Sequence, residues 1–485
     1  MQPSPDMPAF RILTDEKVAR IHAAALKVLA ETGIKVATPD AIELLVDAGC
    51  EVNTGADIVK IPARIVEACL ESCPNEIQLY DREGAACMQL SGRRVYAGIG
   101  TTCIYIRDHE SGQRREAEVA DMALAGRVLD ALPHLDFAAI PLIVNPSQET
   151  PQHVAAQVGF ETLTSNTTKP IMLLGEDANT LKDMLDMAVI LAGGKSSLRK
   201  KPFVCVYPSI ISPLVFDADT LEKINMSADL GLPVRCGSAP LSGGTGPVTT
   251  AGMLVICIAE SLAGIVLSQL RSPGAPVIIG NTAGSMDMKT GNAYYCGPET
   301  SRITMAVADM AHYYQLPVLS PAGLCSDMDC NIQAALELMM SIYGCYLSGS
   351  NLVAHVGGVE AGMTFSLELA ILGDEITGMV KRVMEDIHVD DDTLALDAIQ
   401  SVGPGGHFLT SAHTLQHFRQ EQWQSSILNR CAFDQWQQEG SKQTRQLIKE
   451  TLKSIIATHQ PRPLAEDVRA DLTGFVDHIK NSRSD

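Results

Sequence analysis

The strongest candidate for chemistry in this sequence is a histidine at the end of an apolar run. His355 stands in the segment LVAHVGGVE, where Gly357 and Gly358 follow it and Glu360 comes shortly after. A histidine can accept or donate a proton near neutral pH, and the two glycines leave space beside the ring. A core histidine that hydrogen-bonds to the backbone would occupy the same position. Both interpretations stay open on these residues alone.

Three other groups of residues could bind a metal or a phosphate. His413 and His417 are four residues apart on an expected helix, a spacing that can share a metal, although an ordinary helix face is favoured. Cys325 and Cys330 could hold a soft metal, although buried thiols explain them better. The glycine-rich segment 241–250 resembles a phosphate-binding loop but lacks the lysine of a P-loop. A tight connection between a strand and a helix is the favoured interpretation there.

Short apolar runs alternate with longer helical patterns through the middle of the chain. Several of the runs begin at or just after proline and end in small or polar residues, as buried strands do. Eight such units in succession predict an α/β fold, a (β/α)8 TIM barrel. The expected strands cover residues 95–106, 137–143, 170–174, 203–207, 233–237, 276–280, 317–320 and 352–355. The expected helices cover residues 117–131, 151–165, 178–192, 218–230, 248–272, 298–315, 329–347 and 366–385.

In a barrel of this kind, the residues that act on a substrate follow the carboxyl ends of the strands. There the sequence has many small, amide and hydroxyl residues but few bases, and it places Tyr96, Tyr207 and Asn281 beside His355. A hydrolase would need a metal or a catalytic triad, and neither is evident. A doubly wound open sheet is the alternative fold. It is disfavoured because no G-x-G-x-x-G motif follows the early strands.

The chain divides by pattern into three expected units. Residues 1–93 are expected to form an N-terminal mixed cap, with helices at 14–32 and 39–48 and short strands after them. Residues 94–390 are expected to form the catalytic barrel. Residues 391–485 carry helical patterns without intervening strands, which predicts a helical C-terminal extension.

The charge of the chain limits its partners. It carries 37 basic and 57 acidic residues, a net charge of −20. A charge of this sign argues against non-specific binding to nucleic acid or to anionic membranes. Segment 251–270 is apolar and long enough to span a bilayer, but Glu260 stands in its middle, which favours a buried core helix. The thirteen scattered cysteines include no C-x-x-C pair, and no signal peptide is visible, so we expect reduced thiols in the cytoplasm.

Several separated motifs, in order, resemble the trimethylamine methyltransferase (MttB-like) superfamily. The similarity extends over nearly the whole chain, and any one motif alone would be weak. The motifs are LSGGTGPVTTAG (241–252), GNTAGSMDMKTGNAYYCGPE (280–299), LPVLSPAGLCSD (316–327), AHVGG (354–358), VGPGGHFL (402–409) and RQEQW (419–423).

The resemblance implies a barrel that passes an N-methyl group to Co(I) of a cobalamin carried by a separate corrinoid protein. Members that contain pyrrolysine have it near what is here segment 323–327, where this chain has only ordinary residues. The chain therefore looks like the non-pyrrolysine branch, which demethylates quaternary amines such as glycine betaine, proline betaine or carnitine. A quaternary amine leaves as a neutral tertiary amine, so its demethylation needs positioning and exclusion of water rather than a general acid.

Other functions stay open beside this one. The same barrel could act on a tertiary amine, could bind betaines without catalysis, or could be a metal-dependent hydrolase. The resemblance assigns the positioning of the substrate to His355, which could hold a carboxylate, and large barrels of this kind usually form homo-oligomers. Because a quaternary ammonium group is bound by aromatic faces and negative potential, several side chains are candidates for substrate binding. These are Tyr96, Tyr207, Asn281, Tyr295, Glu360 and Phe365.

Overall fold

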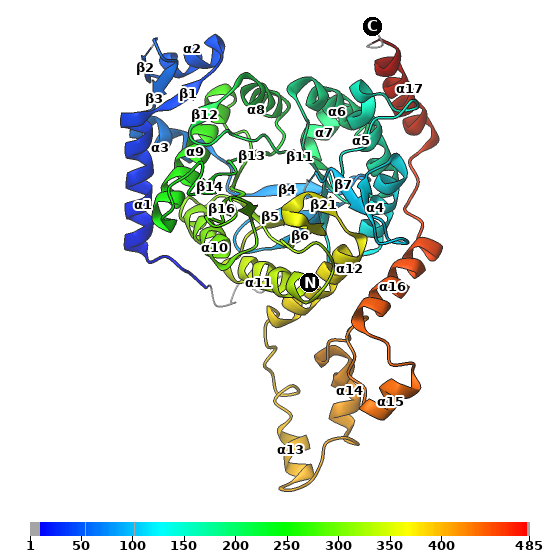
Figure 1. Cartoon of the computed structure of the whole chain (residues 1–485). Helices are drawn as coiled ribbons and strands as arrows, with labels where there is room; N and C mark the ends of the chain where they lie inside the picture. Colours follow the sequence, from blue (N-terminus) through cyan, green and yellow to red (C-terminus); the bar gives the residue numbers. More distant parts are fainter. Residues whose placement is uncertain (1–9, 54, 101, 483–485) are drawn as a thin grey trace.

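The central feature of the computed structural model is a closed barrel of eight parallel strands (Figure 1). The structure describes residues 10–53, 55–100 and 102–482. The barrel closes because β19 pairs with β6, and the predicted (β/α)8 fold is confirmed. In sequence order the barrel strands are β6 (Tyr96–Ile99), β9 (Phe137–Ala139), β10 (Ile171–Leu173), β11 (Val204–Val206), β13 (Val234–Cys236), β15 (Val277–Gly280), β18 (Val318–Pro321) and β19 (Leu352–Val356).

Eight long helices surround the barrel, one after each strand, as the sequence pattern predicted. Several of them begin at a residue whose side chain accepts a hydrogen bond from the first helical turn, among them Asp177, Asp217 and Thr249. The helices are α4 (Val119–Ala131), α5 (Ala155–Asn166), α6 (Ala178–Leu191), α8 (Ala218–Leu230), α9 (Thr250–Arg271), α10 (Pro298–Tyr313), α11 (Ile332–Ser348) and α12 (Leu367–Val383). A short helix, α7 (Lys195–Lys200), follows α6.

Helix α9 is the apolar segment that could have been read as a membrane span. Among the described residues it is the one helix long and apolar enough to cross a membrane, and most of it is buried inside the protein. It packs against α8 and α10 of the barrel and against α1 (Asp15–Lys27) and α3 (Ala63–Ser72) of the N-terminal segment. Glu260 lies buried within it. These contacts agree with the predicted core helix.

The N-terminal segment adds a small sheet at the side of the barrel. A π-helical turn, η1 (Val28–Thr32), continues α1, and α2 (Pro39–Asp47) follows. The sheet has the order β12-β1-β3-β2, so a strand inserted in the barrel region completes it. Its strands are β1 (Ile34–Val36), β2 (Glu51–Asn53), β3 (Ile58–Lys60) and β12 (Val215–Phe216).

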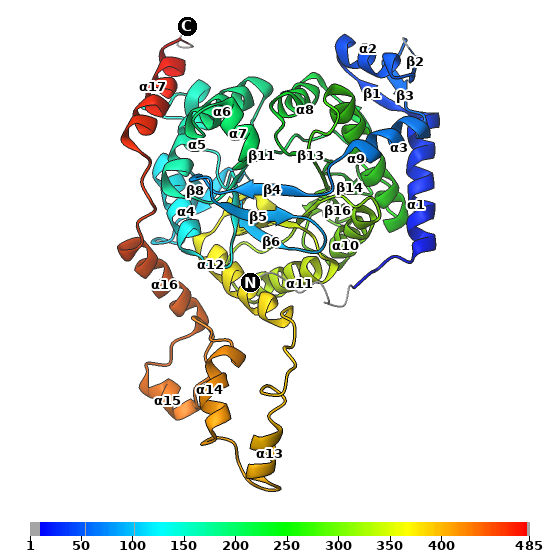
Figure 2. The same cartoon turned by 180° about the vertical axis from the view of Figure 1, so that it is seen from behind.

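A hairpin closes the amino-terminal end of the barrel. Strands β4 (Ile77–Tyr80) and β5 (Ala86–Leu90) cross that end (Figure 2). Their apolar side chains are buried in one cluster with side chains from the barrel interior, including Phe137, Met172 and Leu319. Among the described residues, the hairpin therefore fills the amino-terminal end of the barrel and leaves the carboxyl end as the side of access.

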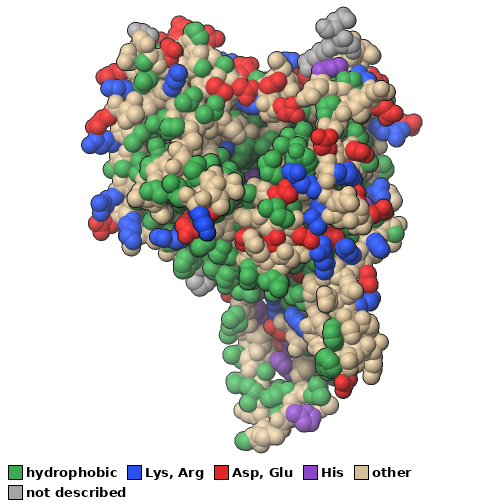
Figure 3. Space-filling model, viewed as in Figure 1, with side chains coloured by type: hydrophobic (Ala, Val, Ile, Leu, Met, Phe, Trp, Pro, Cys, Tyr) green, Lys and Arg blue, Asp and Glu red, His purple; other side chains and the backbone are tan. Residues whose placement is uncertain are grey.

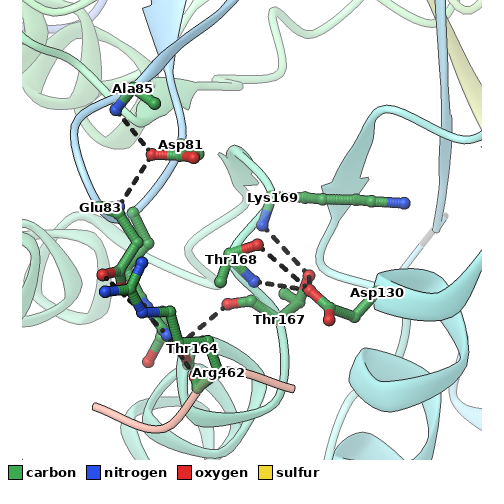
Figure 4. A network of polar contacts seen from close by, with 10 residues as sticks. Asp81, Glu83, Ala85, Asp130, Thr164, Thr167, Thr168, Lys169 and Arg462 are labelled. Atoms are coloured by element: carbon green, nitrogen blue, oxygen red, sulfur yellow. Dashed lines mark hydrogen bonds and ion pairs between the residues drawn. The ribbon is translucent and has the colours of Figure 1, made fainter. Parts of the chain in front are cut away.

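A polar network holds the turn of this hairpin in place (Figure 4). Asp81 accepts hydrogen bonds from the backbone N–H groups of Glu83 and Ala85 within the turn. The buried Arg82 donates to backbone carbonyls of Thr167 in the segment after α5 and of Arg462 near the C-terminus. The hairpin is thus tied to the barrel and to the C-terminal segment.

Small sheets cover the carboxyl end of the barrel. One has the order β14-β16-β17 and the other the order β20-β21-β7-β8. Between them the surface is hollowed and lined mainly by hydrophobic side chains (Figure 3). The strands are β7 (Tyr105–Arg107), β8 (Arg114–Glu116), β14 (Leu241–Ser242), β16 (Gly284–Met286), β17 (Ala293–Tyr294), β20 (Gly358–Val359) and β21 (Thr364–Phe365).

The chain after α12 forms an arm that projects away from the barrel and then returns (Figure 1). No residue of α13 (Leu396–Val402), α14 (Ala412–Glu421) or α15 (Phe433–Gln438) is buried. Helix α16 (Thr444–Thr458) returns to pack on α4 and α12, and α17 (Glu466–Ser482) packs on α5 and α6. The predicted helical extension is present, and the division of the chain into three units stays a prediction.

Candidate active site

A bulge in the last barrel strand directs His355. The pairing of β19 with β6 shifts register between Val353 and Val356, so one strand has an extra residue there. His355 has φ 92°, a conformation that L-residues rarely adopt. Bulges redirect side chains next to active sites, and backbone strain of this kind concentrates where function needs it. The strain marks His355 as a positioned side chain, and its role in catalysis stays a prediction.

The hydrogen bonding of His355 fixes its protonation state. Its Nδ1 lies 2.9 Å from the carbonyl oxygen of Gly100. Because a carbonyl oxygen only accepts, Nδ1 must carry the proton, and Nε2 then presents a bare lone pair. Nε2 is buried and has no hydrogen-bond partner in the described part of the chain. A lone pair cannot donate to a carboxylate, so this tautomer disfavours the expected contact of His355 with a substrate carboxylate, and the role of His355 stays a prediction.

The pKa of His355 is lowered to about 4, mainly by burial; the hydrogen bond to Gly100 opposes this shift, and the positive charge of Arg235 adds to it. We predict that the imidazole stays neutral, with a proton on Nδ1, from pH 8 down to about pH 5. The ring in the unfolded chain has a pKa of 6.5, so it binds a proton below that pH, where the folded ring is still neutral. The free energy of unfolding should therefore fall as the pH drops from 6.5 towards 4.

Nitrogen-15 NMR of the imidazole rings, with the His355 signal assigned from a His355→Gln variant, measures this directly. An ordinary titration of His355 near pH 6.5 would contradict the prediction.

An arginine that was not predicted from the sequence acts electrostatically on this histidine. Arg235 is the central residue of β13, and it alternates with Val234 and Cys236, which face the surrounding core. Its guanidinium carbon lies 4.0 Å from the centre of the Tyr207 ring. A side chain at Gly280 would crowd the Arg235 stem, so that glycine makes room for it. The available signal was one charged residue inside an apolar run.

Arg235 is almost fully buried, and backbone carbonyls hold it. Its Nη1 donates to the carbonyls of Pro208 and Gly237, at 3.3 and 3.0 Å. Its Nη2 donates to the carbonyl of Ser238 and the hydroxyl of Thr282, at 2.9 and 3.3 Å. Its Nε has no partner, and no carboxylate forms an ion pair with it within the described ranges.

Two predicted tyrosines lie at the same side of the barrel mouth. Tyr207 follows β11, and its hydroxyl lies 2.6 Å from the hydroxyl of Thr282. Tyr295 follows β17 and packs close to Gly284, where any side chain would meet its ring. Burial raises the pKa of Tyr295, and the nearby Tyr207 adds to this. We use the term mouth residues for Tyr207, Arg235, Thr282 and His355.

Asn281 lies close by but is already fully engaged. Its Oδ1 accepts from the backbone N–H and the hydroxyl of Ser238, and its Nδ2 donates to the carbonyl of Cys257 and the hydroxyl of Ser261. These partners lie on α9 and on the loop after β13. Buried Glu260 of α9 extends the network through the Ser238 hydroxyl. Asn281 therefore joins the barrel to α9, and no free group remains on it for a substrate.

Glu360 and Phe365 support the loop that follows His355. The Glu360 carboxylate pairs with Arg114 at 2.9 Å and accepts from the Thr364 hydroxyl at 2.7 Å. This pairing reduces the negative potential expected from Glu360. The Phe365 ring is fully buried and packs against the glycine at position 357. Phe365 is fully buried, whereas the Glu360 side chain keeps 20% of its surface exposed.

Tyr96 lies at the other end of the barrel. The sequence suggested one strand over residues 95–106, but β6 begins at Tyr96 and ends at Ile99. The chain leaves the barrel at Gly100, whose φ of 112° breaks the strand. The Tyr96 hydroxyl accepts from the backbone N–H of Gln89 in the closing hairpin, at 3.1 Å. The placement of Tyr96 with the mouth residues was therefore wrong.

The other candidate binding groups are the glycine-rich loop and the histidine pair. In the glycine-rich loop, the N–H groups of Gly243, Gly244 and Gly246 bond to carbonyls of the same loop, which confirms the tight connection. His413 and His417 lie on α14 with their ring centres 4.4 Å apart. No group of three or more His, Cys, Asp or Glu side chains in the described part of the chain could hold a metal ion.

A barrel closed at one end, with a strained histidine and a buried arginine at the carboxyl mouth, has the arrangement of a barrel enzyme. The chain belongs to the trimethylamine methyltransferase (MTTB) family, whose model matches residues 2–484, and it is a methyltransferase of that family.

Named relatives and solved structures agree with this membership. The chain is 33% identical to trimethylamine methyltransferase MttB of Desulfitobacterium hafniense, over 96% of this chain and 94% of that protein. It is 31% identical to a glycine betaine methyltransferase of Desulfitobacterium hafniense strain Y51, over 97% of each chain. The crystal structure of Methanosarcina barkeri monomethylamine methyltransferase MtmB matches with a TM-score of 0.54 at 10% identity, over 98% of this chain and 88% of that one, and so shares the fold.

Proposed function

We propose that this methyltransferase moves an N-methyl group from a quaternary amine of the glycine betaine type to Co(I) of a cobalamin carried by a separate corrinoid protein. The observation that carries the proposal is the neutral His355, whose Nε2 lone pair is buried without a partner. A quaternary amine leaves as a neutral tertiary amine and needs no proton. A tertiary amine would need a proton donor, which this imidazole does not provide.

Segment 323–327 also supports a quaternary substrate. Pyrrolysine-containing relatives would carry their special residue near this segment, whereas here Leu324 and Cys325 are buried core residues. Gly323 has φ 81°, and a side chain on it would collide with Val356. The Cys325 N–H donates to the carbonyl of Gly358 at 2.8 Å. The segment packs as an ordinary core loop next to β20.

The shape of the barrel fits a methyl acceptor brought by another protein. The hairpin closes one end, and the opposite end is hollowed and apolar (Figure 3). When bound there, cob(I)alamin would supply the nucleophile that takes the methyl group. The residues of this chain would hold the amine, align one methyl carbon with the mouth and keep water away. His355 would face the ammonium group with its lone pair, and Tyr295 would add an aromatic face.

Location and self-association belong to the same proposal. None of the thirteen cysteines forms a disulfide bond, and most are buried thiols whose pKa burial raises, which suits a reducing cytoplasm. The arm carries exposed apolar side chains such as Ile387, Leu409 and Leu415, which support a homo-oligomer.

The direct test mixes the protein with reduced cob(I)alamin and a panel of quaternary amines. The visible spectrum should change to that of methylcob(III)alamin with a betaine. Turnover with trimethylamine alone, or with no amine, would contradict the proposal. Thermal stabilisation by betaines without formation of a methyl–cobalt bond would identify a non-catalytic binding protein instead.

A further inference from the structure

We propose that Arg235 binds a carboxylate of the substrate, so that the amine is a zwitterion with an acidic group at one end and a quaternary ammonium at the other. This inference rests on the proposed function and adds to it a residue that recognises the second end of the substrate. It follows from the burial, the unmatched charge and the remaining open hydrogen-bond donor of this one side chain.

The positive charge of Arg235 has no paired negative charge. The side chain is 1% exposed, and within the described residues it makes no ion pair. The carboxylate that acts on Arg235 is that of Glu260, which accepts hydrogen bonds from the Ser212 hydroxyl, the N–H of Leu214 and the Ser238 hydroxyl. Burying an unpaired charge is costly, and proteins accept it mainly where a ligand completes the pair.

Four hydrogen bonds hold the guanidinium in place, and one of its N–H groups is left without a partner. Four of its N–H groups are directed at Pro208, Gly237, Ser238 and Thr282, while the Nε–H is buried and unpartnered. The Tyr207 ring covers one face of the group at 4.0 Å. That face of Tyr207 therefore makes a cation–π contact with Arg235 and is not available to the ammonium group of a substrate. The remaining Nε edge can donate one charge-assisted hydrogen bond to a carboxylate oxygen.

Two buried polar atoms of opposite character thus remain without a hydrogen-bond partner among the mouth residues. The Nε of Arg235 is a donor, and the Nε2 of His355 is an acceptor, and each lacks a partner in the described ranges. The two groups are close enough for the guanidinium to lower the pKa of the imidazole. A zwitterion satisfies both atoms: its carboxylate accepts from Arg235, and the polarised methyl groups of its ammonium face the His355 lone pair.

The same charge discriminates against amines that lack an acidic group. Choline carries the trimethylammonium group of glycine betaine but has a hydroxyl in place of the carboxylate. Inside the mouth, its positive charge would meet the charge of Arg235 with no anion between them. The described structure therefore favours glycine betaine over choline through one residue.

Isothermal titration calorimetry of both ligands tests the assignment. The natural protein should bind glycine betaine about 10- to 100-fold more tightly than choline, the range expected for a hydrogen bond to a charged group. Arg235→Gln should weaken the binding of glycine betaine by a similar factor. It should leave the affinity for choline unchanged or higher, so that the preference for glycine betaine is lost. A purely structural role would instead weaken both ligands together. Equal binding of the two ligands by the natural protein would overturn the proposal.

Arg82 offers a matched control. It is also a buried arginine that donates to backbone carbonyls, but it lies in the closing hairpin at the opposite end of the barrel. Arg82→Gln should lower the melting temperature without changing the ratio of the two affinities. If Arg82→Gln changed the ratio of the affinities for glycine betaine and choline, that ratio would report a general loss of stability. The assignment of Arg235 would then be overturned.

Two further results separate this proposal from the proposed function. If Arg235→Gln does not fold, the natural protein is titrated instead with the methyl ester of glycine betaine. The ester should bind as weakly as choline. If the ester binds as tightly as glycine betaine itself, the assignment of Arg235 is overturned. Methyl transfer from choline as efficient as from glycine betaine would leave the proposed function standing and remove Arg235 as a carboxylate site. Absence of both binding and methyl transfer with every quaternary amine would overturn both.

Discussion

Replacing His355 by alanine should reduce kcat/KM for methyl transfer about 100-fold or more, because a misplaced reacting group costs on this order. In the proposed reaction the imidazole lone pair orients the ammonium group, and its strained backbone and its bond to Gly100 hold it in place. The loss should appear in kcat as well as in kcat/KM, as expected for a residue that aligns the transition state. Steady-state formation of methylcob(III)alamin measures both constants.

His312 provides the control for this substitution. It is a partly buried histidine on α10, and its Nε2 lies 2.9 Å from the carbonyl of Ser348, away from the mouth residues. His312→Ala should cost stability as any lost hydrogen bond does, about 1 kcal/mol, and leave the kinetic constants of methyl transfer unchanged. If His355→Ala behaves like His312→Ala, His355 has only a structural role.

Gly237→Ala is expected to prevent folding, or to lower the free energy of unfolding by about 4 kcal/mol or more. Gly237 follows β13, and a methyl group there would overlap the backbone carbonyl of Gly280 on the neighbouring strand. Backbone within a closed barrel cannot move aside as a flexible side chain can. The same residue also supplies a carbonyl that accepts from Arg235, so any folded variant should lose the Arg235 geometry as well.

Denaturation in urea measures this change, and Gly474→Ala is the matched control. Gly474 lies on α17, where an added methyl group would meet nothing, and alanine favours a helix over glycine by about 0.5–1 kcal/mol. Gly474→Ala should therefore be stable and active. A Gly237→Ala protein with an unchanged urea midpoint would show that the barrel can separate these two strands.

Most of the barrel could be predicted from the sequence because its strands are buried on both faces. Such strands appear as continuous apolar runs between helical patterns, and all eight were identified. The boundary of the first strand was less predictable. The apolar pattern of residues 95–106 continues past Ile99, but the left-handed backbone at Gly100 takes the chain out of the barrel and into β7.

The site was predictable in residue types but not in partners. His355 and Tyr207 follow from their places at strand ends. The ion pair of Glu360 with Arg114 and the hydrogen bonds of Asn281 to α9 could not be predicted, because these partners come from distant parts of the chain. Arg235 was missed for a related reason. One arginine in an apolar strand does not reveal which face it occupies, and only the closed barrel shows that it points inward.

The hairpin formed by β4 and β5 has a consequence for the order of events in the proposed reaction. With the amino-terminal end blocked by described residues, the amine and the proposed methyl acceptor would both use the carboxyl end. The amine would then have to enter first, since a docked acceptor protein would cover that end. The demethylated product must then wait until that protein departs. Initial-rate kinetics should therefore follow a compulsory sequence, with the acceptor the last substrate to arrive and the first product to leave.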